Sequence, residues 1–207
     1  MRQGPNVTLG RKAEALIESQ IEAFGWHHVG DSQFGATHAP MLRSRGSDLI
    51  RPDYLVMKGG NRVWIEVKAK TDSLAFGTVE RHGISTHKLE SYQKVADVSG
   101  NPCWLFIYEK STGVVLCEDI HKIPVASQRV KQRYGPDDPY GEGMVFFNRK
   151  DFNLVKISRD RYPTHFFGQD KLPLQNMEGE ESSTLFPGSK LGAVKPRPDS
   201  RLSDFTD

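Results

Sequence analysis

Three residues suited to metal-dependent chemistry stand in two short apolar runs around a Gly-Gly turn, in the segment RPDYLVMKGGNRVWIEVKAK at 51–70. A turn centred on the two glycines makes these runs a β-hairpin, in which Asp53 is expected directly opposite Glu66. Like charges across a strand pair repel, so the two carboxylates need a cation or water between them. Lys68 follows Glu66 by two residues and therefore shares its face of the strand. Mg²⁺ suits this position because it prefers carboxylate oxygens, keeps several waters and binds phosphate.

The elements that must position these side chains follow from the hydrophobic pattern. The hairpin register pairs Tyr54 with Ile65 and gives the hairpin one apolar face. Apolar residues at helical spacing predict an amphipathic helix over residues 11–24, which Gly25 ends. The other expected elements are a helix at 86–99, strands at 103–109 and 114–120, later strands at 144–148 and 152–157, and loops at 27–50 and 71–83.

The pattern resembles the PD-(D/E)xK nucleases, whose motif is an Asp, a short gap and then Glu-x-Lys on the next strand. Here the motif would be Pro52-Asp53 followed by Glu66-Val67-Lys68. The resemblance implies an α/β, restriction-endonuclease-like core, with a central mixed β-sheet flanked by helices in the order αβββαβ, plus a C-terminal extension. It covers roughly residues 10–110.

Two further positions come from the same resemblance. The first helix is similar to that of archaeal Holliday-junction resolvases, which implies Glu14 as an additional carboxylate and leaves Glu18, one turn later, as the alternative. Many members carry Gln-x-x-x-Tyr after the third strand, and this chain has Lys88-x-x-x-Tyr92. Lys88 is therefore a candidate for contacting a phosphate, whereas Tyr92, on the apolar stripe, is expected to be a core residue.

The activity implied by the resemblance is Mg²⁺-dependent endonucleolytic hydrolysis of DNA, with Mn²⁺ as a substitute. Asp53, Glu66, the main-chain carbonyl of Val67 and Glu14 would hold the metal, and Lys68 would orient the attacking water. The cations expected to bind flanking phosphates are Arg51, Arg62, Lys70 and Lys88. A nuclease-like module without activity, which binds nucleic acid or assembles with a partner, remains an alternative, as does an RNA nuclease. The form of the substrate and the oligomeric state are both open; a homodimer is one alternative, since cutting both strands commonly uses two copies.

Composition bounds the class of protein. The chain has 207 residues, 37% of them hydrophobic, and a net charge of +2, which is too small to indicate nucleic-acid binding by itself. The longest apolar stretch, Cys103 to Tyr108, is far too short to span a membrane, and the first residues lack the apolar segment of a secretion signal. We therefore expect a cytoplasmic protein, in which Cys103 and Cys117 are buried reduced thiols.

A change of composition near residue 170 predicts the domain organisation. Residues 1–169 are expected to form the nuclease-like domain, with its core at about 10–120 and later strands at about 144–157. Residues 170–207 are rich in Pro, Gly, Ser and charge, with apolar residues too scattered for a core. This segment is expected to be a flexible or partner-binding tail, with Leu185, Phe186, Leu202 and Phe205 as candidate anchors for another protein.

Overall fold

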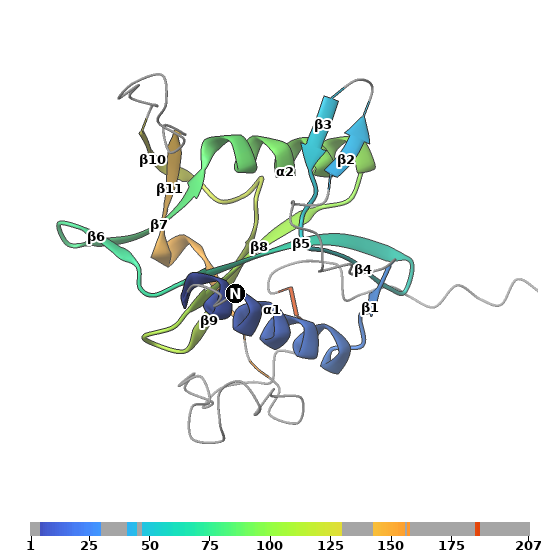
Figure 1. Ribbon diagram of the computed structural model, residues 1–207, viewed down its shortest axis with the longest axis horizontal. Helices are drawn as coiled ribbons and strands as arrows, with labels where there is room; N and C mark the ends of the chain where they lie inside the picture. The colour runs from blue at the N-terminus through green and yellow to red at the C-terminus, as the bar shows by residue number, and fades with distance from the viewer. Residues whose placement is uncertain are drawn as a thin grey trace, which may run out of the picture.

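A six-stranded mixed sheet forms the centre of the computed structural model, which describes residues 5–29, 41–44, 47–129, 143–155, 157 and 185–186. In spatial order its strands are β1 (His27–His28), β4 (Tyr54–Lys58), β5 (Asn61–Lys70), β8 (Cys103–Glu109), β9 (Val114–Asp119) and β12 (Asn153–Leu154). Helix α1 (Pro5–Ala23) packs on one face of this sheet and α2 (Thr86–Ser99) on the other (Figure 1). The expected α/β class and the central mixed sheet flanked by helices are confirmed.

Two smaller sheets complete the described structure. A four-stranded sheet has the order β10 (Val125–Arg129), β11 (Met144–Asn148), β7 (Val79–Ser85) and β6 (Leu74–Phe76). A two-stranded sheet pairs β2 (Met41–Ser44) with β3 (Ser47–Ile50). The 3-10 helix η1 (Arg149–Asp151) connects β11 to β12. No helix in the described part of the chain has the length and apolar character needed to cross a membrane.

The hairpin β4–β5 has the register predicted from its turn. Tyr54 pairs with Ile65 and Lys58 with Asn61. The two turn glycines have φ angles of 55° and 86°, which is the left-handed region that a tight hairpin turn requires and that glycine adopts without a Cβ penalty. The apolar face of the hairpin packs into the core beneath α1.

The connection from β5 to β8 places α2 over the strand that carries Glu66. Strands β5 and β8 run parallel, so a crossover must join them, and α2 lies in that crossover. The helix spans the predicted range, with Ser85 as its N-cap in extended conformation and Gly100 as its C-cap at φ 64°. Strand β8 is buried along its whole length, as its apolar run predicts.

Helix α1 begins at Pro5, six residues before the predicted start at 11. Proline fits the first turn of a helix because its missing N–H has no intrahelical acceptor there. The buried stripe starts at Ala13, and only the partly buried Leu9 precedes it against the core, so the first turns carry too weak a periodic signal to predict them. The stripe itself lies against the central sheet, as expected.

The loops expected at 27–50 and 71–83 are wrong in part. Strands β1, β2 and β3 lie within the first range and β6 and most of β7 within the second, while β10 was not expected. Strand β7 is polar in sequence, VERHGIS, but pairs on both sides, with β6 and with β11 more than 60 residues further along the chain. Pairing with the distant β11, in addition to the neighbouring β6, overrides the weak local pattern.

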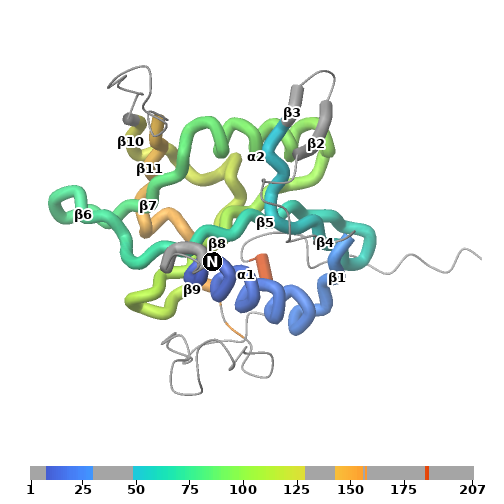
Figure 2. Tube along the Cα trace, viewed as in Figure 1, coloured from blue at the N-terminus to red at the C-terminus, as the bar shows by residue number. Residues whose placement is uncertain are grey.

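Two residues of the expected tail lie in the core of the chain itself. Leu185 and Phe186 are both 0% exposed, beside α1 (the short red segment in Figure 2). The ring of Phe186 lies 4.8 Å from that of Trp26 and 5.1 Å from that of Trp104. The expectation that these two residues anchor another protein is therefore corrected. Leu202 and Phe205 lie outside the described residues, and the domain boundary near 169 stays a prediction.

Candidate active site

Glu66 lies on β5 and points toward α2, because alternate residues of β5 face opposite sides of the sheet. Its side chain is buried, with the residue only 1% exposed. The ammonium group of Lys68 and the hydroxyl of Tyr92, the latter at 2.6 Å, both donate to its Oε1. The other oxygen, Oε2, is buried and has no hydrogen-bond partner among the described residues. One oxygen of Glu66 is therefore fixed and the other remains open to a ligand.

Tyr92 is the residue whose role the sequence did not show. It is buried on the apolar stripe of α2, as predicted, but its hydroxyl also holds Glu66. The Lys-x-x-x-Tyr spacing is the signal that pointed to this position, since residues four apart lie on one face of a helix. Lys68 Nζ lies 5.7 Å from the centre of the Tyr92 ring, so this ring also contacts the lysine.

Asp53 lies directly before β4, and it adjoins Glu66 across the hairpin because the next pair is Tyr54 with Ile65. Its Oδ2 accepts a 2.7 Å hydrogen bond from the main-chain N–H of Val67. Burial raises the pKa of Asp53, although the positive charge of Lys68 and the Val67 hydrogen bond oppose this effect. The hairpin thus brings the two carboxylates together, as expected.

The two candidate carboxylates of α1 have different surroundings. Glu14 is half-buried, and burial raises its pKa; the negative charge of Asp53 raises it further, while Lys68 opposes the shift. Glu18 is exposed, with Oε1 3.9 Å from Nε2 of His28. Glu14 therefore interacts electrostatically with Asp53 and Lys68, which favours Glu14 over Glu18 as the carboxylate that α1 contributes to the site.

Four cations were expected to contact phosphates, and three of them lie near the carboxylates. The positive charges of Lys70 and Lys88 lower the pKa of Lys68. Those of Arg51 and Lys88 oppose the rise in the pKa of Asp53. Arg62 stands at the turn end of β5, roughly 13 Å along the strand from Glu66 at the usual rise per residue, and is exposed. The structure therefore separates Arg62 from this cluster.

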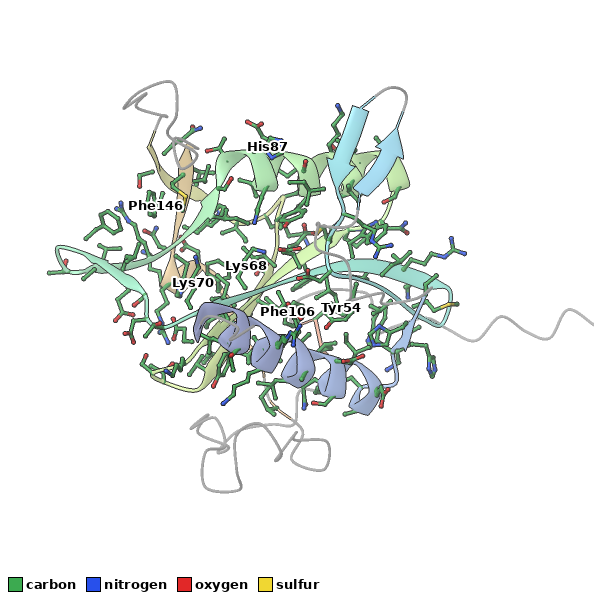
Figure 3. All side chains as sticks on the ribbon, viewed as in Figure 1. Tyr54, Lys68, Lys70, His87, Phe106 and Phe146 are labelled. Atoms are coloured by element: carbon green, nitrogen blue, oxygen red, sulfur yellow. The ribbon has the colours of Figure 1, made fainter. Side chains whose placement is uncertain are left out.

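The pKa of Lys68 is strongly shifted by its surroundings. Burial lowers the pKa of Lys68 to about 8, with Asp53 opposing this shift and Lys88 and Lys70 adding to it. Burial and then the charge of Lys88 also lower the pKa of Lys70. In Figure 3, Lys68 and Lys70 lie along β5 beneath α2.

The carboxylates suit a hard divalent cation in one mode of binding. Among the residues that the structure describes, no group of three or more His, Cys, Asp or Glu side chains is arranged to hold a metal ion, so Glu14 does not complete a preformed set. Mg²⁺, however, usually keeps several waters and takes only one or two carboxylates together with substrate phosphates. Asp53, and Glu66 with its unpartnered buried Oε2, fit that mode.

A second buried polar cluster, which the sequence did not predict, surrounds Glu109 at the end of β8. His82 Nε2 lies 2.6 Å from Glu109 Oε1, and Arg149 donates from Nε and Nη2 at 2.8 Å each. Burial alone would raise the pKa of Glu109, but hydrogen bonds from His82, Arg149 and Thr112 outweigh it and lower the pKa to about 2. The only sequence signal is a charged residue closing an apolar strand.

Comparisons with known proteins come from solved structures alone, since no family model and no curated protein matches the chain. The Holliday junction resolvase Hjc of the archaeal hyperthermophile Archaeoglobus fulgidus is similar over 69% of this chain and 91% of that chain, at 12% identity and a TM-score of 0.45. A nuclease from a fusselovirus is similar over 74% of this chain and 90% of its own, at 14% identity and a TM-score of 0.37. Similarities at this identity and TM-score are too low to assign the fold, so the fold is assigned from the order and pairing of the chain's own elements. The elements α1, β1, β4, β5, α2 and β8 follow the order αβββαβ expected of a restriction-endonuclease-like fold, with Asp53 directly before β4 and the triplet Glu66-Val67-Lys68 on the adjoining β5.

Proposed function

We propose that this chain is a metal-dependent endonuclease that hydrolyses phosphodiester bonds in DNA. The observation that carries the proposal is the state of Glu66. A buried carboxylate has one oxygen fixed by Lys68 and Tyr92 and the other without a partner, directly beside the carboxylate of Asp53. Lys68 supplies one positive charge for the two adjoining carboxylates, Asp53 and Glu66, and burying carboxylates without enough compensating charge is costly, so a site that retains both is a candidate for binding a cation.

In the proposed site, Asp53 and Glu66 bind Mg²⁺ or Mn²⁺, with the carbonyl of Val67 as a third ligand and Glu14 as the carboxylate from α1. When bound, the metal supplies positive charge that neutralises the scissile phosphate and activates a water. The Val67 N–H holds Asp53 in place, and the Tyr92 hydroxyl fixes the orientation of Glu66. Both contacts preorganise the carboxylates before substrate arrives.

Lys68 has a separate role in the proposal. With a pKa of about 8, its ammonium group is mainly protonated at neutral pH and carries positive charge next to the carboxylates. That charge stabilises the negative charge that develops on the phosphate oxygens, and the same N–H groups orient the attacking water. Lys68 is therefore expected to act on the rate of cleavage and not on the binding of the metal.

The test is a cleavage assay with purified protein on supercoiled, linear, branched and single-stranded DNA and on RNA, in Mg²⁺, Mn²⁺ or EDTA. We expect cleavage of at least one DNA form in the presence of metal, none in EDTA, and none with Glu66→Gln. Glu90→Gln is the matched control, because Glu90 is an exposed residue of α2 and its loss should leave the rate unchanged. Metal-dependent cleavage of RNA alone would replace DNA by RNA as the substrate. The absence of both cleavage and metal-dependent stabilisation would support an inactive module.

A further inference from the structure

Lys70 and Lys88 bring two positive charges together beside the proposed site. Lys70 is half-buried at the end of β5, and Lys88 is exposed on α2. The charge of Lys88 lowers the pKa of Lys70, and the side chain of Lys68 leaves β5 on the same face as that of Lys70, two residues earlier. Neither Lys70 nor Lys88 forms an ion pair within the described part of the chain.

The positions of Lys70 and Lys88 follow from the lengths over which β5 and α2 return a side chain to the same face. Two residues of β5 advance about 6.6 Å, and one turn of α2, four residues, advances about 6 Å. Ser99 at the end of α2 accepts a hydrogen bond from Trp64 near the start of β5, and Tyr92 donates to Glu66, so the helix runs opposite to the strand. The residue one turn before Tyr92, Lys88, therefore lies over the positions of β5 that follow Glu66, toward Lys68 and Lys70. A row of positive charge therefore leads away from the carboxylates along the face of β5 that α2 covers.

The nearest acid to Lys70 in the sheet is Glu109, but its acceptor sites are occupied. Lys70 and Glu109 are partners in the parallel register of β5 and β8, so their side chains leave the sheet on the same face, about 5 Å apart at their bases. A carboxylate has about four acceptor sites. Glu109 already meets four donors, one from His82, two from Arg149 and one from Thr112.

We propose that Lys70 and Lys88 together bind the phosphate next to the scissile phosphate, and that Arg149 and His82 are positioning residues that keep Glu109 from neutralising Lys70. The inference rests on the proposed function and adds to it a second phosphate subsite and the reason for the buried cluster around Glu109. It also explains why a charge cluster with no part in the carboxylate site lies next to β5.

The first test measures DNA binding in EDTA, where no cleavage occurs, by fluorescence anisotropy of a labelled duplex over a range of salt concentrations. Lys70→Gln and Lys88→Gln should each weaken binding. Because both lysines bind one phosphate, the double variant should lower the slope of log K against log salt by only about 1 and lose less affinity than the sum of the single variants. Lys94→Gln, which removes an exposed charge from another side of α2, is the matched control and should behave as the parent chain. Lysine variants that match the control would overturn the subsite.

The second test separates the positioning role from a structural one. Arg149→Met frees two acceptor sites of Glu109, so Glu109 can pair with Lys70 and DNA binding should weaken as it does in Lys70→Gln. Adding Glu109→Gln to Arg149→Met removes the competing charge and should restore the affinity, whatever happens to the melting temperature. If Arg149→Met does not fold, Arg149→Lys gives the same comparison because it also loses the two-pronged contact. If adding Glu109→Gln does not restore the affinity, the positioning role is overturned.

Failure of this inference and failure of the proposed function give different results. A parent chain that neither binds nor cleaves any nucleic acid contradicts the proposed function itself. A parent chain that cleaves DNA, with Lys70 and Lys88 variants that bind like the control, contradicts only the subsite.

Discussion

Phe186 offers the sharpest test of the core, because it comes from a segment whose composition predicts a tail. Its side chain is 0% exposed, and its ring packs edge-on against Trp26 and lies 6.0 Å from the ring of Phe106. Replacing a buried phenylalanine by alanine removes its apolar contacts and leaves a cavity. We therefore expect Phe186→Ala to destabilise the whole domain.

The magnitude follows from the burial. Phe→Ala at a fully buried position costs about 3–5 kcal/mol. For a domain of this size each kcal/mol lowers the melting temperature by about 2–4 °C, so the expected fall is roughly 6–20 °C. Truncation after residue 169 also removes Leu185, which is 0% exposed, and should cost at least as much.

The assay is thermal and urea unfolding followed by circular dichroism, with Leu154→Ala as the control because Leu154 is 57% exposed. That control should change the free energy of unfolding by less than about 0.5 kcal/mol. A Phe186→Ala protein or a truncated chain that melts at the parent temperature would refute the packing of this segment in the core.

Three further predictions concern the carboxylates and their partners. In EDTA at neutral pH, the Asp53→Asn chain should be as stable as the parent or more so. Burial raises the pKa of Asp53, so its ionised form costs folding free energy above that pKa. Melting in EDTA checks this, and a large loss of stability would contradict it. Tyr92→Phe removes a hydrogen bond to a buried charge, so it should cost about 1.5–3 kcal/mol of stability and also slow cleavage, measured by urea unfolding beside the initial rate; an unchanged rate would show that Tyr92 only packs. Glu109 has a folded pKa of about 2, below its ordinary value near 4.5, so its stabilising contribution is present above pH 4.5 and is lost as the pH falls toward 2. Urea unfolding over this range should show a weaker acid dependence in Glu109→Gln than in the parent chain. Equal dependence in the two proteins would argue against the cluster.

The parts of the fold that the sequence predicted are those with strong local signals. The Gly-Gly turn determined the register of β4 and β5, because a tight turn at these glycines pairs Tyr54 with Ile65, and a slip by one residue would move the apolar side chains to the other face. Helix α2 was predicted to its ends by its apolar stripe, by Ser85 or Thr86 as candidates for the N-cap, and by Gly100 as the residue that stops it. The register alone was enough to bring Asp53 next to Glu66.

The parts that the sequence did not predict depend on contacts between distant segments. Strand β7 has a polar sequence without a local period, and it pairs with the distant β11 as well as with the neighbouring β6. The hydroxyl of Tyr92 looks like any core tyrosine until α2 is placed over β5. Phe186 is an isolated aromatic residue in a polar segment, and only the aromatic rings of Trp26 and Trp104 show that it belongs to the core.

The most direct measurement of the central claim is Mg²⁺-dependent stabilisation and DNA cleavage compared in the parent chain, Glu66→Gln and Lys68→Ala. A metal that binds the folded state stabilises it by about 2.7 kcal/mol at a hundredfold excess over its dissociation constant, so the parent chain should melt at a higher temperature with Mg²⁺ than with EDTA. We predict that Glu66→Gln loses both this shift and cleavage, and that Lys68→Ala keeps the shift but cleaves slowly. Metal-dependent cleavage by Glu66→Gln at the parent rate would contradict the proposed site.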